Sequence, residues 1–390
     1  MKLNHNLHLG YSSNIHRGQN WRETLDSLEK YTLAVRDKIL PHGWFGIGLR
    51  LSAGAAVELS ERNTLLAFQR WLEKHNCYIF TINGFPYGQF HGARVKEQVY
   101  QPDWTSPGRL EYTNMLFDLL GELVPAGVEG SVSTLPGSFK EFINSESQEK
   151  AMRQNLWRCL EHIERVSKRS GRKLHLGLEP EPLCYLENTR ETIAFFEQMR
   201  EDRPGDLRLN EFLGVNYDCC HFAVEYEEPE VALAAFQEEG IRISKLHLSS
   251  ALKTTATNEA RAVLAKFSDD VYLHQVIARE NGKLKFYRDL PDALVGGSNL
   301  KTQDAKLAEW RIHFHVPLHA PAASPLENTN DHLLGVMDLL GRNPKLCPHL
   351  EMETYTWEVL PPELKSQNVV DQLAAEYQWT LARLAERGLC

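Results

Sequence analysis

Residues that could bind a metal ion or transfer protons stand at the ends of short segments in which apolar residues alternate with polar or small ones. Four of them follow one another along the chain: Glu179, Asp218, His247 and Glu353. Carboxylates combined with an imidazole suit a divalent cation such as Mn²⁺, Mg²⁺, Fe²⁺ or Zn²⁺. For any one residue, a solvated strand end with an unrelated charge is the simpler interpretation. The recurrence at four strand ends favours a shared metal site.

Further polar groups could contact a substrate. In Asp218-Cys-Cys-His221, the histidine follows the candidate ligand by three residues and could bind substrate, bind a second ion, or lie on a surface loop. Glu351 shares the strand face of Glu353 and is either a deeper ligand or a supporting group. Arg50 is an inward cation at a strand end that could hold a phosphate or carboxylate.

His313 and His315 lie on one face of the segment Trp310–His319. If this segment folds over the other candidate residues, the two imidazoles could bind a substrate oxyanion or further metal ions. The alternative is a surface hairpin with incidental histidines.

The elements that must position these side chains alternate along the chain. Period-two segments predict strands over 7–10, 45–51, 77–83, 132–135, 174–179, 212–218, 241–249 and 350–355. Helical spacing predicts helices over 21–40, 57–75, 110–124, 147–170, 190–200, 230–239, 326–340 and 368–387.

Eight strands alternating with helices predict a (β/α)8 TIM barrel of the α/β class, with a doubly wound open sheet as the alternative. One face of each strand is apolar, whereas the other is polar or small, as in Leu176 and Leu178 against Gly177 and Glu179. Strands of an open parallel sheet are buried on both faces and read as nearly continuous apolar runs. A barrel that opens into a polar site fits the observed alternation better.

The alternation breaks down between residues 251 and 324. Short strand-like segments at 271–278, 284–287 and 311–317 occur there, and Asn281-Gly282 is a strong hairpin signal. We therefore expect residues 1–390 to form a single TIM-barrel domain, with residues 251–324 as a β-rich excursion after strand seven, over the C-terminal face of the barrel.

The composition of the chain limits the classes of partner that we expect. The net charge of -9 argues against nucleic acid, because phosphate binding favours a basic face. Seven cysteines without a CxxC pair favour reduced thiols. The polar first eight residues do not resemble a secretion signal, and no apolar run is long enough to be inserted in a membrane. We expect a cytoplasmic protein with a small-molecule substrate.

The motifs Leu178-Glu179-Pro180, Asp218 to His221, His247 and Glu353 resemble those of the xylose-isomerase-like superfamily of barrels. That superfamily includes sugar-phosphate isomerases, hexulose epimerases and phosphodiesterases of the endonuclease IV type. In the epimerases, the equivalents of Glu179, Asp218, His247 and Glu353 hold the metal. The resemblance implies that the two glutamates also act as catalytic acid and base and that His221 binds substrate.

More specifically, the segments 311–318 and 349–357 resemble the EboE-type metabolite traffic proteins. Those belong to a bacterial gene cluster linked to moving or processing a secondary-metabolite precursor. The resemblance implies possible protein partners from a biosynthetic cluster.

Three functions follow as hypotheses. The first is a metal-dependent isomerase or epimerase acting on a small sugar-like or hydroxycarbonyl metabolite. The second is a metal-dependent phosphoester hydrolase that uses extra ions at His221, His313 and His315. The third is a non-catalytic protein that binds a metabolite.

Overall fold

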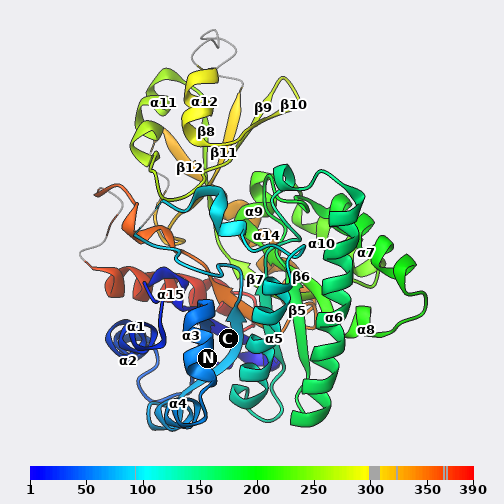
Figure 1. The fold of residues 1–390 in the computed structure, drawn as a ribbon. Helices are drawn as coiled ribbons and strands as arrows, with labels where there is room; N and C mark the ends of the chain where they lie inside the picture. The colour runs from blue at the N-terminus through cyan, green and yellow to red at the C-terminus, as the bar shows by residue number, and fades with distance from the viewer. Residues whose placement is uncertain (93, 298–307, 322–323, 363–364, 366–367) are drawn as a thin grey trace.

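Eight parallel strands close into a barrel that helices surround (Figure 1). The computed structural model describes residues 1–92, 94–297, 308–321, 324–362, 365 and 368–390. The barrel strands, in chain order, are β1 (His8–Ser12), β2 (Phe45–Arg50), β3 (Cys77–Asn83), β4 (Gly130–Thr134), β5 (Leu174–Leu178), β6 (Leu213–Asp218), β7 (Arg242–Leu248) and β13 (His349–Met352). Their order around the barrel is β1-β13-β7-β6-β5-β4-β3-β2. The predicted (β/α)8 fold is therefore confirmed.

Capping residues set the ends of helices that connect and cover the strands. Asn188 caps the start of α7 by accepting a hydrogen bond from the backbone of Glu191, and Gly171 ends α6 in a left-handed conformation (φ 69°). The longer helices around the barrel are α1 (Trp21–Ser27), α2 (Leu33–Ile39), α3 (Ala53–Ser60), α4 (Arg62–Lys74), α5 (Pro107–Leu123), α6 (Glu146–Ser170), α7 (Thr189–Asp202), α10 (Pro229–Glu238), α14 (Asn330–Arg342) and α15 (Val369–Ala385). Among the described residues, no helix combines the length and the apolar content that crossing a bilayer requires.

Two predicted helices were wrong as single elements. The helix expected over 57–75 is two helices, α3 and α4, because Glu61 between them is extended (ψ 124°). The helix expected over 21–40 contains a wider turn at Leu28–Thr32 between α1 and α2.

The excursion forms a second, antiparallel sheet with its own apolar core. Its strands, in spatial order, are β10 (Lys283–Tyr287), β9 (Val276–Glu280), β11 (Glu309–His315), β8 (Ala251–Thr255) and β12 (Leu326–Asn328), with α11 (Asn258–Leu264) and α12 (Leu290–Gly296) packed beside it. The Asn281-Gly282 turn joins β9 to β10 as predicted, with both residues at positive φ. Residues 326–328, expected to begin a helix, instead pair with β8 as the edge strand β12.

Alternation along β11 explains how this sheet faces the barrel. Trp310, Ile312 and Phe314 fill the core of the second sheet. Successive side chains of a strand point to opposite faces, so His313 and His315 point away from that core. Figure 1 shows the sheet standing above the barrel body.

Candidate metal centre and its cavity

Strand register brings three of the predicted residues to one level of the barrel. His247 of β7 is paired with Asp218 of β6 on one side and with Glu351 of β13 on the other. Glu179 follows the last residue of β5 directly. The Nδ1 atom of His247 lies 2.9 Å from Oε1 of Glu179 and 3.2 Å from Oδ2 of Asp218. All four side chains are buried.

Glu353 lies on the other side of the same imidazole. Its Oε2 atom is 3.9 Å from Nε2 of His247, whereas Oε2 of Glu351 is 3.2 Å from that nitrogen. Ser12, the last residue of β1, and Asn14, two residues further on, donate hydrogen bonds of 2.8 and 2.9 Å to the Glu353 carboxylate. The structure thus gathers Glu179, Asp218 and His247 tightly and sets Glu351 and Glu353 across the ring.

Two residues that sequence reasoning did not include in the site hold Glu351 in place. Lys245, two residues before His247 on the same strand face, donates hydrogen bonds to Glu351 at 2.5 Å and to Ser133 at 3.0 Å. Gly48 leaves the space that the carboxylate occupies, because a Cβ atom there would lie 1.7 Å from Oε1 of Glu351. The inward parity of Lys245 was the available signal, but its partner depends on the barrel register.

The Asp-x-x-His motif has a local structural basis. Asp218 caps the short helix α9 (Cys219–Val224) by accepting a hydrogen bond from the backbone N–H of His221. One helical turn then carries the His221 ring above the strand ends. Its Nδ1–H donates to the carbonyl oxygen of Pro180 at 2.9 Å, which leaves Nε2 as the lone-pair nitrogen.

His313 and His315 repeat this arrangement from the second sheet. Nδ1 of His313 bonds to Oε1 of Gln275 at 2.8 Å, and Nδ1 of His315 bonds to the carbonyl oxygen of Glu353 at 2.7 Å. Their Nε2 atoms are buried without a hydrogen-bond partner. Anchoring one ring nitrogen on an oxygen acceptor is how proteins orient the other toward a metal.

The surroundings of the buried carboxyl groups shift their pKa values in different directions. Burial raises the pKa of a carboxyl, but at Glu179 the His247 ring outweighs burial and the pKa is lowered. At Glu353 burial outweighs the attraction of His247, and the neighbouring carboxylates add to it, so the pKa is raised. Burial also raises the pKa of Glu181, to about 8. One ionised and one protonation-prone carboxyl therefore face the same ring.

The donor set fits a divalent cation. Ligand atoms of Glu179, Asp218 and His247 all lie within 4.8 Å of one another, as do those of Asp218, His221 and His315. Oε2 of Glu179 is a buried acceptor with no hydrogen-bond partner, as a ligand atom awaiting a cation would be. Oxygen and imidazole donors suit Mn²⁺, Mg²⁺, Fe²⁺ or Zn²⁺.

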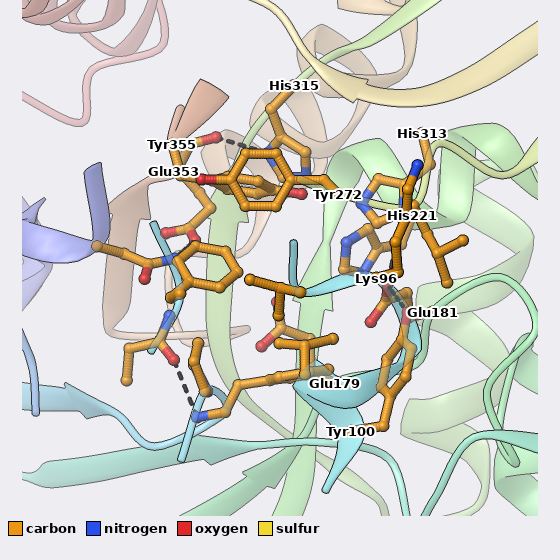
Figure 2. A pocket seen from close by; sticks show the side chains of 18 residues that line it. Lys96, Tyr100, Glu179, Glu181, His221, Tyr272, His313, His315, Glu353 and Tyr355 are labelled. Carbon is orange, nitrogen blue, oxygen red and sulfur yellow. Dashed lines mark hydrogen bonds and ion pairs between the residues drawn. The ribbon is translucent and has the colours of Figure 1, made fainter. Parts of the chain in front are cut away.

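A cavity that is open to solvent lies above these groups. Figure 2 shows Glu181, His221 and His313 along one side of it and His315, Glu353 and Tyr355 together at another. Tyr100 donates a 2.7 Å hydrogen bond to Glu181, another residue that sequence reasoning had not assigned to the site.

Two predicted substrate-binding residues do not line this cavity. Glu351 lies below it, held by Lys245. The guanidinium of Arg50 donates to the carbonyl oxygens of Gly18 and Gly88 and borders a separate surface hollow. Its hydrogen-bonding capacity is therefore directed at the backbone of two loops.

Comparison with known proteins finds solved structures with a similar fold. No protein-family model and no curated protein matches the sequence. A xylose isomerase-like TIM barrel protein from Mycobacterium smegmatis in complex with magnesium is similar in structure, with a TM-score of 0.54 and 12% identity over 99% of both chains. An L-ribulose 3-epimerase has a TM-score of 0.51 and 12% identity over 99% of this chain and 96% of its own. D-Psicose 3-epimerase from Clostridium cellulolyticum H10 has a TM-score of 0.50 and 12% identity over 98% of this chain and 100% of its own. The chain therefore shares the (β/α)8 barrel fold of these structures.

Proposed function

We propose that this protein is a metal-dependent isomerase or epimerase that acts on a small hydroxycarbonyl metabolite. The observation that carries the proposal is the placement of Glu179 and Glu353 on opposite sides of the His247 ring, both lining one cavity. Their pKa values move in opposite directions, which suits a base paired with an acid.

The reaction follows from these two carboxyl groups. Glu179 takes the proton from the carbon that bears a hydroxyl group, and the C–H electron pair forms the C=C bond of an enediolate as the carbonyl oxygen becomes negative. Glu353 then returns a proton, to the opposite face of the same carbon for epimerisation or to the neighbouring carbon for isomerisation. In isomerisation the hydroxyl proton also moves to the former carbonyl oxygen, so that the first carbon becomes the new carbonyl. One proton is gained by the protein and one is given back.

A divalent cation would be held by Glu179, Asp218 and His247, with Glu353 as the fourth group. When bound, it supplies positive charge to the substrate oxygens on which negative charge develops. A structure with this fold was solved in complex with magnesium, which supports a metal in this chain as well. His221, which lines the cavity, would contact the substrate.

Metal content per chain tests the proposal first. We expect about one equivalent by elemental analysis, lost in Asp218→Ala and kept in the exposed control Asp26→Ala. The metal-loaded protein should then exchange solvent deuterium into a hydroxycarbonyl substrate, and Glu179→Gln should abolish the exchange. No metal in the wild-type protein after incubation with Mn²⁺ or Zn²⁺ would overturn the proposal.

A second function, phosphoester hydrolysis, is favoured by one observation. His221, His313 and His315 lie close together, with ring centroids 4.6 to 5.6 Å apart, and could hold additional ions beside Asp218. Two-metal and three-metal sites clamp the attacking and leaving oxygens of a phosphoryl group. This function requires two or three metal equivalents per chain and hydrolysis of bis(p-nitrophenyl) phosphate, so a stoichiometry of one excludes it.

A third role is to bind a metabolite without turnover, as part of a metabolite traffic pathway with protein partners. The resemblance of the segments 311–318 and 349–357 to metabolite traffic proteins supports it, and both segments contribute to the cavity through His315 and Tyr355. Mass spectrometry of the purified protein should then find a retained small molecule. Deuterium exchange at a hydroxycarbonyl carbon would exclude a purely passive role.

A further inference from the structure

The cavity has two chemically different ends, which meet where the Tyr355 ring centroid lies 4.7 Å from that of His315. Its carboxylates and imidazoles gather at the end that the barrel strands and β11 supply. The other end consists of aromatic and aliphatic side chains from the loops after β3, before β9 and after β13. Its main members are Phe85, Phe90, Val99, Tyr272, Leu273 and Tyr355.

Three rings from distant parts of the chain form the main wall at the apolar end. The Phe90 ring centroid lies 5.2 Å from that of Tyr272 and 5.3 Å from that of Tyr355, and Tyr272 and Tyr355 are 5.5 Å apart. Such spacings are typical of packed aromatic groups. The Tyr355 ring also lies 4.7 Å from the imidazole of His315, and Figure 2 shows both side chains.

Two tyrosine hydroxyl groups of the cavity wall, those of Tyr272 and Tyr100, are already engaged within the protein. Nδ1 of His91 bonds to the Tyr272 hydroxyl, and the Tyr100 hydroxyl donates to Glu181. By contrast, the buried polar atoms without partners belong to the other end: Oε2 of Glu179, Oδ1 of Asn14, and Nε2 of His313 and His315. A polyol that filled the cavity would leave its far hydroxyl groups facing carbon, at a free-energy cost.

Charge at the cavity also argues against a phosphorylated substrate. Among the described residues that line the cavity, Lys96 is the single Lys or Arg. Its ammonium donates to the Asp289 carboxylate at 2.6 Å and to the carbonyl oxygen of Asp269 at 2.9 Å. Arg50 is turned toward the carbonyls of Gly18 and Gly88. A phosphate at the apolar end would therefore lack a counter-charge.

We infer that the substrate is an uncharged aromatic hydroxycarbonyl compound. Its oxygen-bearing head lies against the carboxylates and imidazoles, and its ring lies against the wall formed by Phe90, Tyr272 and Tyr355. This inference rests on the proposed metal-dependent function for the head and on the cavity wall for the ring. Tyr272 and Leu273 belong to the excursion, so this part of the specificity is supplied by the second sheet and its connections.

Three probes that share the head HOCH₂–C(=O)– test the inference: 2-hydroxyacetophenone, 1,3-dihydroxyacetone and dihydroxyacetone phosphate. Their dissociation constants for the Mn²⁺-loaded full-length protein are measured by calorimetry. We expect 2-hydroxyacetophenone to bind about tenfold more tightly than dihydroxyacetone or better, because its ring is removed from water. Dihydroxyacetone phosphate should bind no more tightly than dihydroxyacetone. Equal or tighter binding of either non-aromatic probe overturns the inference.

Two variants at the apolar end give matched controls. Val99→Phe fills the space beside the ring and should weaken 2-hydroxyacetophenone binding about tenfold while dihydroxyacetone stays within about twofold. Phe90→Leu, a milder change, should reduce the preference for the aromatic probe in the same direction. Both variants should keep the metal content of the wild-type protein. Equal weakening of both probes in a variant that retains its metal would count against a ring subsite.

The same measurements separate failure of the inference from failure of the proposed function. Metal-dependent binding without preference for the ring overturns the aromatic substrate and leaves the isomerase proposal intact. Suppose instead that 2-hydroxyacetophenone binds no better than acetophenone, and equally well without metal. That result supports the ring subsite and removes the proposed function at the head.

Discussion

At the scale of single residues, the most informative pair is Lys245 and Glu351, which lies below the cavity and does not reach it. Glu351 lies 3.2 Å from Nε2 of His247 and accepts a 2.5 Å hydrogen bond from Lys245. In the metal-bound protein, Nε2 of His247 would carry the proton and donate to Glu351, so the lone pair of Nδ1 would face the cation held with Glu179 and Asp218. Carboxylates in this relation to a ligating histidine fix its tautomer and orientation.

We therefore predict that Glu351→Leu lowers the affinity for Mn²⁺ about 10- to 100-fold, as loss of such supporting groups does. The single change also strands the Lys245 charge in the barrel and should cost about 3 to 5 kcal/mol of stability. In the double variant Lys245→Met/Glu351→Leu, both charges are replaced by apolar groups, so stability should recover while metal affinity stays low. Calorimetric titration and chemical denaturation measure the two effects separately. A double variant with wild-type affinity would show that the pair only fills space.

At the scale of elements, helix α15 is tied to the end of β13 by a buried carboxyl. Glu376 accepts a 2.8 Å hydrogen bond from Thr354, which follows Glu353. Burial raises the pKa of Glu376 to about 7. The folded protein then holds a proton that the unfolded chain releases near pH 4.5, so stability falls as the pH rises from about 5 to about 7.

The raised pKa of Glu376 predicts that the free energy of unfolding falls by about 3 kcal/mol across that pH interval. Glu376→Gln, which cannot ionise, should flatten this part of the stability profile. Denaturation midpoints at pH 5 and pH 8 provide the measurement, with the exposed Glu386→Gln as the control on the segment that follows α15. Parallel profiles for wild type and Glu376→Gln would contradict the assignment.

The second sheet is fastened to the barrel through Tyr226, which follows helix α9. Its ring lies 4.1 Å from the Arg311 guanidinium carbon and 4.6 Å from that of Arg279, and its hydroxyl donates to the carbonyl oxygen of Glu309 at 2.7 Å. Cation–π contacts of this kind contribute about 0.5 to 2 kcal/mol each. We predict that Tyr226→Ala accelerates hydrogen exchange in β9 and β11 about tenfold, with barrel strands unchanged. Tyr226→Phe, which keeps the ring, should lie between. Unchanged exchange in the sheet would show that other contacts hold it.

How far the sequence predicts these elements depends on the range of the contacts that define them. Alternation such as Leu176 and Leu178 against Gly177 and Glu179 is local, and it predicts the strands and the barrel correctly. The choice between Glu351 and Glu353 is different, because register pairs Glu351 with His247 across two strands 104 residues apart. The contact between His91 and Tyr272 joins residues 181 apart and no local pattern marks it. Thus the packing of Phe90, Tyr272 and Tyr355 into one wall could not be predicted from the sequence.

At the scale of the whole molecule, the barrel interior is polar. The usual layers of branched apolar side chains in such barrels are replaced here by groups that include Ser131, Ser133, His175, Lys245 and Glu351, all buried. Strands with this interior contribute less apolar burial, so the core between strands and helices must supply it. Buried carboxylates that face one another also oppose folding unless a positive charge balances them.

That balance leads to a prediction for the complete protein. A cation that binds only the folded state stabilises it, by about 2.7 kcal/mol when its free concentration is 100 times its dissociation constant. We expect Mn²⁺ or Zn²⁺ to raise the thermal midpoint of the wild-type protein in proportion to the logarithm of the metal concentration. In Asp218→Ala the shift should vanish, since the proposed site of Glu179, Asp218 and His247 loses the residue that it shares with the neighbouring group of His221 and His315. Asp26→Ala, on the exposed face of α1, should shift like the wild type. An equal shift in all three proteins would mean that the ions act at the surface, and the carboxylates of the barrel would then have to be balanced by Lys245 and the imidazoles alone.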